Sequence, residues 1–168
     1  SGCSVARRPR IMASVLKVDE IQSTSAGGIL MPKQPRWDVV GNNDAYVATS
    51  PIPFPTVVID NANGFNTSTY AYTIPIAGDY FVEVNMGILR LIGDNQVAFP
   101  RLEQNGVNKG YSYLQLNVDG THYASNVVNR ILTCAVGDTI RCAFLNSGGT
   151  GKYYNGAAES RFHGYLVG

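Results

Sequence analysis

Short strand-forming runs alternate with tight-turn sequences along most of this chain, and this regular punctuation constrains the fold more than any other feature. Val, Ile, Thr and aromatic residues fill the runs, while Gly, Asn, Asp and Pro fill the gaps, as in G-N-N-D and V-G-D. The predicted strands are 36–40, 45–49, 56–60, 69–74, 79–91, 97–104, 111–118, 127–135, 139–145 and 160–167. Strands this short and this evenly spaced, with no convincing amphipathic helix, predict an all-β sandwich or barrel.

The charge composition argues against several kinds of partner. Charged residues make up only 15% of the chain and the formal net charge is +1, so no overall field attracts nucleic acid or anionic lipid. Arg7, Arg8 and Arg10 form a small basic cluster, but three arginines in an unpatterned segment are too few to predict a nucleic-acid arm. No apolar run is long enough to span a bilayer and no secretory signal is visible, so we expect no membrane insertion.

The chain divides into three segments. Residues 1–11 lack periodicity and precede a Met-Ala that resembles a natural start, which indicates an upstream extension or a vector remnant. Residues 12–34 contain one alternating run, V-L-K-V-D-E-I, followed by a Ser/Gly-rich linker. Because a lone strand cannot bury a face by itself, we predict that this arm anchors to another chain; the alternative is a disordered tail. The predicted anchor residues are Val15, Leu16, Val18 and Ile21, and the main domain is predicted at 35–168.

Two features predict how the interior packs. From Tyr80 to Met86 apolar and polar residues alternate, so the even-numbered side chains are expected to share one face. Gly164 is expected to let the last strand pass close to a bulky neighbour. Cys134 and Cys142 flank a Gly-Asp turn, so a disulfide between them is conceivable, but two free buried thiols are the favoured interpretation.

The chemistry of an enzyme is missing from the sequence. The Gly-rich run at 148–152 lacks the first glycine and the final Ser or Thr of a phosphate-binding loop. His122 and His163 have no ligand-spaced partners, and no nucleophile motif is present. The turn carboxylates are explained by capping of backbone N–H groups, although calcium binding by loop oxygens stays open. We therefore predict a protein that is not an enzyme and that needs no cofactor and no metal.

Four motifs in order resemble the C1q/TNF-like pattern. F-N-T-S-T-Y-A-Y-T-I-P-I-A-G-D-Y-F at 65–81 is followed by L-E-Q-N-G at 102–106, then by L-x-x-x-V-G-D-T-I at 132–140, and finally by F-H-G-Y-L at 162–166. The resemblance covers about 35–168. It implies a two-sheet antiparallel jelly-roll sandwich that assembles as a homotrimer.

The large aromatic residues supply candidates for the core and for contact surfaces. Candidates for the core or the trimer interface are Trp37, Tyr80, Phe81, Tyr111, Tyr113, Phe162 and Tyr165. Tyr70 and Tyr72 are also expected to contribute to the core. Candidates for partner binding in an apical loop are Thr150, Lys152, Tyr153 and Tyr154.

The arm carries a second resemblance. M-A-S-V-L-K-V-D-E-I-Q, followed by I-L-M-P-K-Q-P-R-W, is similar to the openings of structural proteins of marine tailed phages. This implies a virion protein, made in the bacterial host cytoplasm, whose arm binds other virion proteins and whose head binds a host-surface glycan or protein from a fibre or other appendage. Two alternatives stay open: a trimer that decorates and cements a capsid, and a soluble C1q-like lectin.

Overall fold

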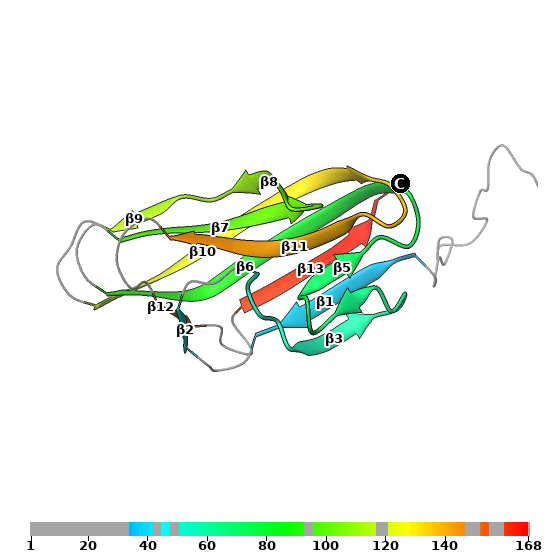
Figure 1. Ribbon diagram of the computed structural model, residues 1–168. Coiled ribbons are helices and arrows are strands. Elements are labelled where there is room, and N and C mark those ends of the chain that lie inside the picture. The colour runs from blue at the N-terminus through cyan, green and yellow to red at the C-terminus, as the bar shows by residue number, and fades with distance from the viewer. Residues whose placement is uncertain are drawn as a thin grey trace, which may run out of the picture. The chain divides into compact units, whose positions relative to one another are not determined.

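Every regular element in the described part of the chain is a strand, and the strands form two antiparallel sheets (Figure 1). The structure, a computed structural model, describes residues 34–41, 45–47, 51–92, 96–116, 121–146, 152–154 and 160–167, some of them by backbone alone. The seven-stranded sheet consists of β1 (Arg36–Val40), β2 (Ala45–Val47), β3 (Thr56–Asp60), β6 (Gly78–Ile92), β10 (Thr121–Cys134), β12 (Lys152–Tyr154) and β13 (Ser160–Leu166). The six-stranded sheet consists of β4 (Phe65–Asn66), β5 (Ala71–Thr73), β7 (Gln96–Gln104), β8 (Val107–Tyr111), β9 (Leu114–Leu116) and β11 (Thr139–Asn146).

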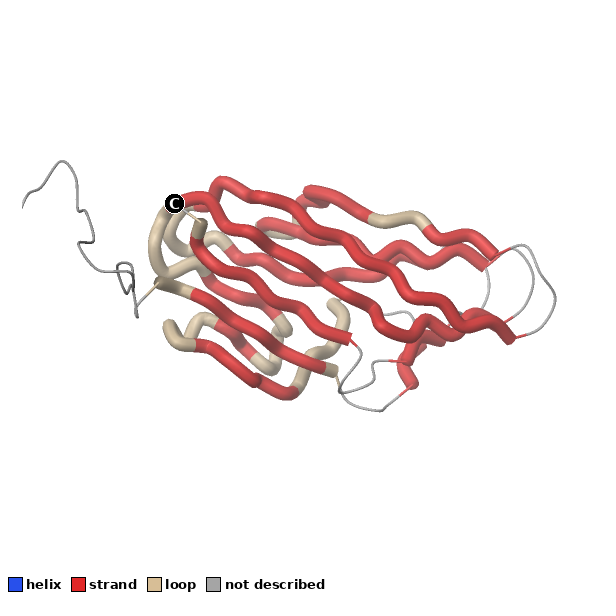
Figure 2. The backbone as a smooth tube through the Cα atoms, turned by 180° about the vertical axis from the view of Figure 1, so that it is seen from behind, coloured by secondary structure: helices blue, strands red, loops and turns tan. Residues whose placement is uncertain are grey.

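The long strand β6 organises the seven-stranded sheet. β10 pairs with one edge of β6, while β13 and β12 follow one another along its other edge. β1 continues the sheet beyond β13, and β3 lies beyond β1. In the second sheet the order is β4-β5-β11-β7-β8, with β9 also paired to β7. Figure 2 shows the two layers from behind, and the predicted two-sheet sandwich is confirmed.

The core lies between the inner faces of the two sheets. The even-numbered residues of β6 from Tyr80 to Met86 are fully buried, as the alternation predicted. Trp37 stacks on Tyr72 from the opposite sheet, with ring centroids 3.9 Å apart and planes 14° apart. Phe162 meets the Trp37 ring edge-on at 5.6 Å. Burial of these large rings supplies much of the apolar area that holds the layers together.

Gly164 makes room for the Trp37 indole, which confirms the expected close approach. The two residues lie opposite each other in the β1–β13 pairing. A Cβ atom at Gly164 would lie 2.6 Å from Trp37 Cζ2 and 2.7 Å from the Phe81 carbonyl oxygen. Glycine is therefore required here because the adjacent space is already occupied.

The Gly137-Asp138 turn carries the chain from one sheet to the other, since β10 and β11 lie in different sheets. Gly137 adopts a φ of 87°, which glycine tolerates without strain. The Asp138 carboxylate accepts hydrogen bonds from Asn105 Nδ2 at 2.7 Å, from the Ala135 N–H at 2.9 Å and from Gln104 Nε2 at 2.7 Å. The carboxylate thus ties the crossover to the turn between β7 and β8.

This turn makes stability depend on pH. The hydrogen bonds from Asn105, Ala135 and Gln104 lower the pKa of Asp138 below its ordinary value. Because the folded pKa lies below the unfolded one, the stabilisation is present above about pH 4 and is lost as the pH falls through the folded pKa. We expect the thermal midpoint to fall less steeply on acidification in Asp138→Asn than in the unaltered protein, as followed by circular dichroism. Parallel pH profiles would contradict this expectation.

Both described cysteines are free and buried, as favoured from the sequence. Burial raises the pKa of the Cys134 thiol to about 11 and that of Cys142 well above its ordinary value. Thiols protonated over the whole physiological range are poor nucleophiles. They serve as small core side chains.

Several sequence expectations were wrong in detail. The single strand expected at 111–118 is two strands, β8 ending at Tyr111 and β9 beginning at Leu114, because Pro100 in the middle of β7 has no N–H to donate; the Ser112 N–H between them donates to the Pro100 carbonyl at 3.1 Å. Strand β4 and most of β8 lie outside the predicted strands. Asp79, at the start of the predicted strand 79–91, lies in β6 and accepts a 2.6 Å hydrogen bond from Thr133 Oγ1. Tyr70, expected in the core, lies in a turn with a φ of 52°.

Candidate self-association surface

The outer face of the seven-stranded sheet carries a row of exposed apolar side chains. Tyr165 on β13 and Ile131 on β10 are the cross-strand neighbours of Phe81 on β6, so the three side chains form one line. Ile131 is 64% exposed and Tyr165 is 46% exposed, while Phe81 is half-buried. The Phe81 and Tyr165 ring centroids lie 5.4 Å apart. Val127, 43% exposed, adds a further apolar side chain on the same side of β10.

The row exists because strand geometry turns alternate residues outward. Val82 and Val84 flank Phe81 and Glu83 on β6 and are fully buried, and Val128 and Leu132 fill the same inward role on β10. The residues between them must face outward, since side chains alternate along a strand. An isoleucine and two aromatic rings directed outward form an apolar strip on a sheet face.

Most charged groups beside this row are paired within the chain; the exception among the described residues is Arg36, which is exposed, lies opposite Tyr165 in the β1–β13 pairing and makes no ion pair there. Arg161 binds Asp38 through two contacts, of 2.5 and 3.2 Å. Glu83 accepts a hydrogen bond from Asn129 Nδ2 at 3.2 Å, and His163 Nε2 lies 4.0 Å from the Glu83 carboxylate. None of β1, β6, β10 and β13 contains a lysine.

This pairing lowers the cost of covering the face. A buried charge without a partner is strongly unfavourable, whereas one already paired loses less on desolvation. Protein interfaces likewise combine aromatic anchors with a depletion of lysine at their centre. An apolar row without lysine and beside a paired Arg161 and Asp38 therefore suits contact with another protein surface.

Some aromatic candidates lie in the core and others on the outer sheet face. Trp37, Tyr80 and Phe162 are buried inside one chain, where they serve the core. Phe81 and Tyr165 come together on the outer face described above.

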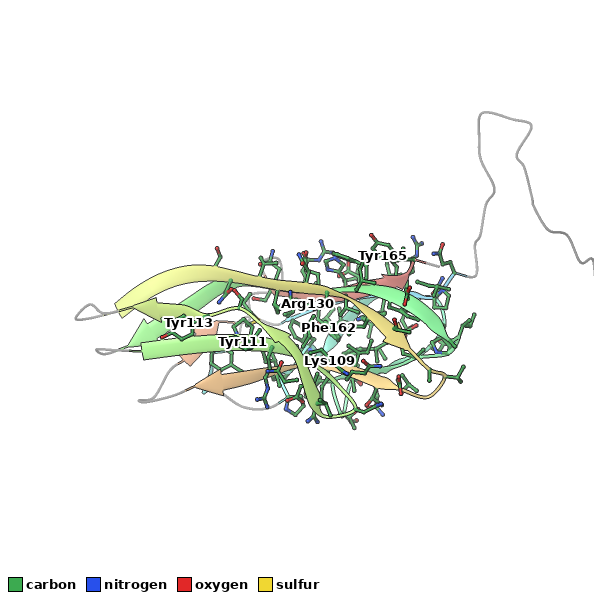
Figure 3. The ribbon with its side chains drawn as sticks, turned by 90° about the horizontal axis from the view of Figure 1, so that it is seen from above. Lys109, Tyr111, Tyr113, Arg130, Phe162 and Tyr165 are labelled. Carbon is green, nitrogen blue, oxygen red and sulfur yellow. The ribbon has the colours of Figure 1, made fainter. Side chains whose placement is uncertain are left out.

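Tyr111 and Tyr113 lie elsewhere. Tyr111 ends β8, where it pairs opposite Arg101 of the six-stranded sheet, and Tyr113 follows it. The two rings are 56% and 53% exposed. Figure 3 shows both along the β8 edge with Lys109, while Tyr165 is on β13. The structure thus assigns these two pairs of aromatic residues to different surfaces.

The proposed apical-loop residues were placed wrongly in part. Lys152, Tyr153 and Tyr154 lie in β12, which pairs with β2 and β6, rather than in a loop. Their side chains, and Thr150 altogether, lie outside the described residues, as do the arm candidates Val15, Leu16, Val18 and Ile21.

Two contact residues were missed from the sequence. Ile131 and Val127 were included in a predicted strand but not recognised as outward-facing. The signal was their alternation with Val128 and Leu132, because two apolar residues on each side of a strand cannot all enter one core.

Within the described residues, the structure brings together no cluster of three or more His, Cys, Asp or Glu side chains that could hold a metal ion. The same part of the chain contains no helix able to cross a membrane. Elsewhere in the described residues, the buried Glu103 carboxylate, 2% exposed, pairs with Arg101 at 2.6 Å and with Arg141 at 2.7 Å. These three residues form paired charges on neighbouring strands.

No protein-family model and no curated protein matches the sequence. Among solved structures, the globular domain of zebrafish complement 1qA protein is similar, with a TM-score of 0.60 and 17% identity, covering 80% of this chain and 98% of that chain. The Eiger TNF of S. frugiperda is similar with a TM-score of 0.59 and 14% identity, covering 81% of this chain and 94% of that chain. At these identities the likeness concerns the fold alone.

Proposed function

We propose that this chain, which has the two-sheet jelly roll of C1q and TNF domains, is a non-enzymatic structural head that assembles as a homotrimer. The observation that carries the proposal is the row of Tyr165, Phe81 and Ile131 on the outer sheet face, near the Arg161–Asp38 ion pair. Contact between subunits would remove this apolar surface from water, and the Arg161–Asp38 pair would need no new partner there.

Sedimentation tests the assembly directly. We expect the purified protein to sediment at three times its mass of 18.1 kDa at micromolar concentration. We expect no contact between subunits through the rings of Trp37, Tyr80 and Phe162, since these rings are already buried inside one chain. A stable monomer at that concentration would contradict the proposed trimer.

The sequence resemblance of the arm supports a role in a phage virion. In this proposal residues 12–34 bind other virion proteins and the head projects from a fibre or other appendage to contact a host-surface glycan or protein. The protein is made in the bacterial cytoplasm and assembles into the particle. Mass spectrometry of purified particles tests this placement, and absence of the protein from them contradicts it.

Deleting residues 12–32 separates two virion roles. A fibre head without its arm should keep its receptor binding. A capsid-cementing trimer without its arm should lose particle binding and leave a fragile capsid.

A further inference from the structure

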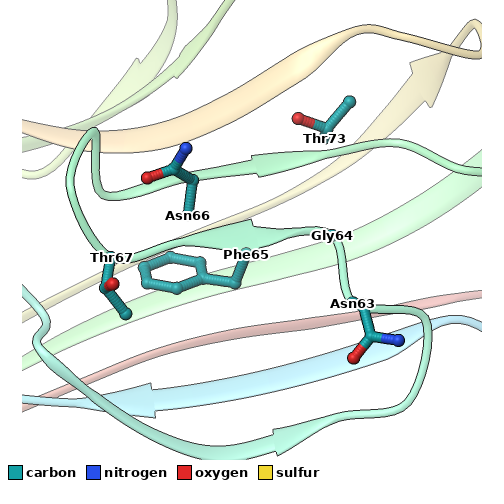
Figure 4. Close-up of a pocket in the computed structure, with 6 residues that line it drawn as sticks. All are labelled: Asn63, Gly64, Phe65, Asn66, Thr67 and Thr73. Carbon is teal, nitrogen blue, oxygen red and sulfur yellow. The ribbon is translucent and has the colours of Figure 1, made fainter.

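A shallow pocket of about 430 Å³ lies beside the short strand β4. Its lining comes from one continuous part of the chain and from the neighbouring strand β5. The lining residues are Asn63, Gly64, Phe65, Asn66, Thr67 and Thr73. Figure 4 shows Asn63 and Thr67 towards the two ends of β4 with the Phe65 ring between them. The volume falls within the range of roughly 300–1,000 Å³ that is typical of small-molecule sites.

Hydrogen bonds fix the walls of this pocket before any ligand arrives. The Asp60 carboxylate accepts from the Gly64 N–H at 3.1 Å and from the Phe65 N–H at 2.8 Å. The Thr73 N–H donates to the Gly64 carbonyl at 2.8 Å. Asn66 Oδ1 accepts from the Ser68 and Thr69 N–H groups. A site fixed in this way loses little conformational entropy when it binds.

Gly64 allows the backbone beside β4 to approach β5 closely. A Cβ at this position would lie 2.7 Å from the Thr73 carbonyl oxygen and 2.7 Å from Tyr72 Cε2. Only glycine lets the β4 backbone lie this close to β5. The backbone itself therefore forms part of the lining, which leaves room beside the Phe65 ring.

The polar side chains in the lining are neutral and keep unused hydrogen-bonding capacity. Within the described residues, the Asn63 amide, Asn66 Nδ2 and the hydroxyls of Thr67 and Thr73 make no hydrogen bond. An amide supplies donors and acceptors together, and a hydroxyl supplies both. Phe65 also lines the pocket; its half-buried ring packs against the core, with its centroid 6.3 Å from that of Phe162.

The absence of charge selects the ligand class. No lining residue is charged, and the nearby Asp60 carboxylate is occupied by two backbone N–H groups. An anion would therefore find no cation here, and a metal ion no carboxylate among the lining residues. A neutral molecule with alternating hydroxyl and C–H surfaces matches amides, hydroxyls and an aromatic ring.

We propose that this pocket binds one neutral sugar unit. The proposal extends the function proposed above, because it gives the head a recognition site. It does not depend on assembly, since the lining residues lie on β4, β5 and adjoining turns, and none lies on β6, β10 or β13.

Saturation-transfer NMR with methyl glycosides of glucose, galactose, mannose and N-acetylglucosamine tests the site. At about 10 mM probe, ten times a 1 mM dissociation constant, we expect transfer to at least one glycoside. Asn63→Gly should weaken binding about tenfold by removing the amide, while glycine keeps the left-handed backbone at φ 54°. Asn66→Asp should do the same, because it keeps the Oδ1 acceptor of the turn and replaces the Nδ2 donor.

Thr56→Ala, at an exposed position of β3 outside the pocket, is the matched control and should bind as the unaltered protein does. Unfolding midpoints measured on the same samples show that each variant is folded. Transfer to no glycoside, transfer in both pocket variants as strong as in the unaltered protein, or preference for inorganic phosphate or sulfate would each overturn the sugar site. A variant that no longer assembles should still bind sugar, so failure of the trimer and failure of the pocket give different results.

Discussion

Replacing Gly164 with alanine is expected to lower the free energy of unfolding by about 3 kcal/mol or more. The new Cβ would collide with the Trp37 indole and with the Phe81 carbonyl oxygen, at 2.6 and 2.7 Å. Neither can move away easily, because Trp37 is stacked on Tyr72 in the core and Phe81 lies in the central strand of its sheet. Urea unfolding followed by tryptophan fluorescence measures the loss, since Trp37 is the single tryptophan of the chain.

Gly110→Ala provides the control. A Cβ at Gly110 would also lie close to another residue, 2.5 Å from Arg130 Nε, but that atom is near the end of a flexible exposed side chain. Arg130 can turn away, so we expect a loss of less than about 1 kcal/mol. Equal losses for the two glycine variants would show that the space occupied by Trp37 is not what requires glycine at 164.

Ile131→Lys is expected to weaken self-association by about a hundredfold or more. The substitution places an unpaired charge at the β10 end of the apolar row, where contact between subunits would bury it. Folding of the single chain should change by about 0.5 kcal/mol or less, because Ile131 is 64% exposed within it. Analytical ultracentrifugation over a concentration series measures the shift from trimer to monomer.

Val136→Lys is the matched control for this variant. Val136 is 66% exposed, close to the value for Ile131, but it lies in the turn between β10 and β11 rather than on the sheet face. The Val136→Lys variant should assemble as the unaltered protein does. A trimer that survives Ile131→Lys, or one that Val136→Lys disrupts equally, would show that the sheet face is not the contact surface.

Local patterns in the sequence were sufficient to predict most of the strands. β1 and β3 were predicted at their observed bounds, and the alternation from Tyr80 to Met86 correctly identified the inward face of β6. The split between β8 and β9 was missed because it depends on Pro100 in the neighbouring strand. β4 has two residues, too few for any periodicity to appear.

The residues of the candidate surfaces were harder to predict from the sequence, because they too depend on neighbouring strands. From the sequence alone, Trp37, Phe81, Tyr111 and Tyr165 were a single set of large aromatic residues. Whether a ring lies in the core or on a surface depends on which strand covers it, and Trp37 is covered by the opposite sheet whereas Phe81 is not. The pocket beside β4 was not predicted either, since its shape depends on how closely Gly64 approaches Thr73 and the Tyr72 ring.

The sequence by itself determined the all-β fold class, the inward face of the long strand and the turn at Gly137-Asp138. Each of these follows from side-chain alternation or backbone freedom within a few residues of chain. Only the tertiary structure decided that Tyr165, Phe81 and Ile131 form one row and that Asp38 and Glu83 have partners beside it. These residues lie far apart in sequence, and their proximity depends on the strand order and register, which only the folded sheets define.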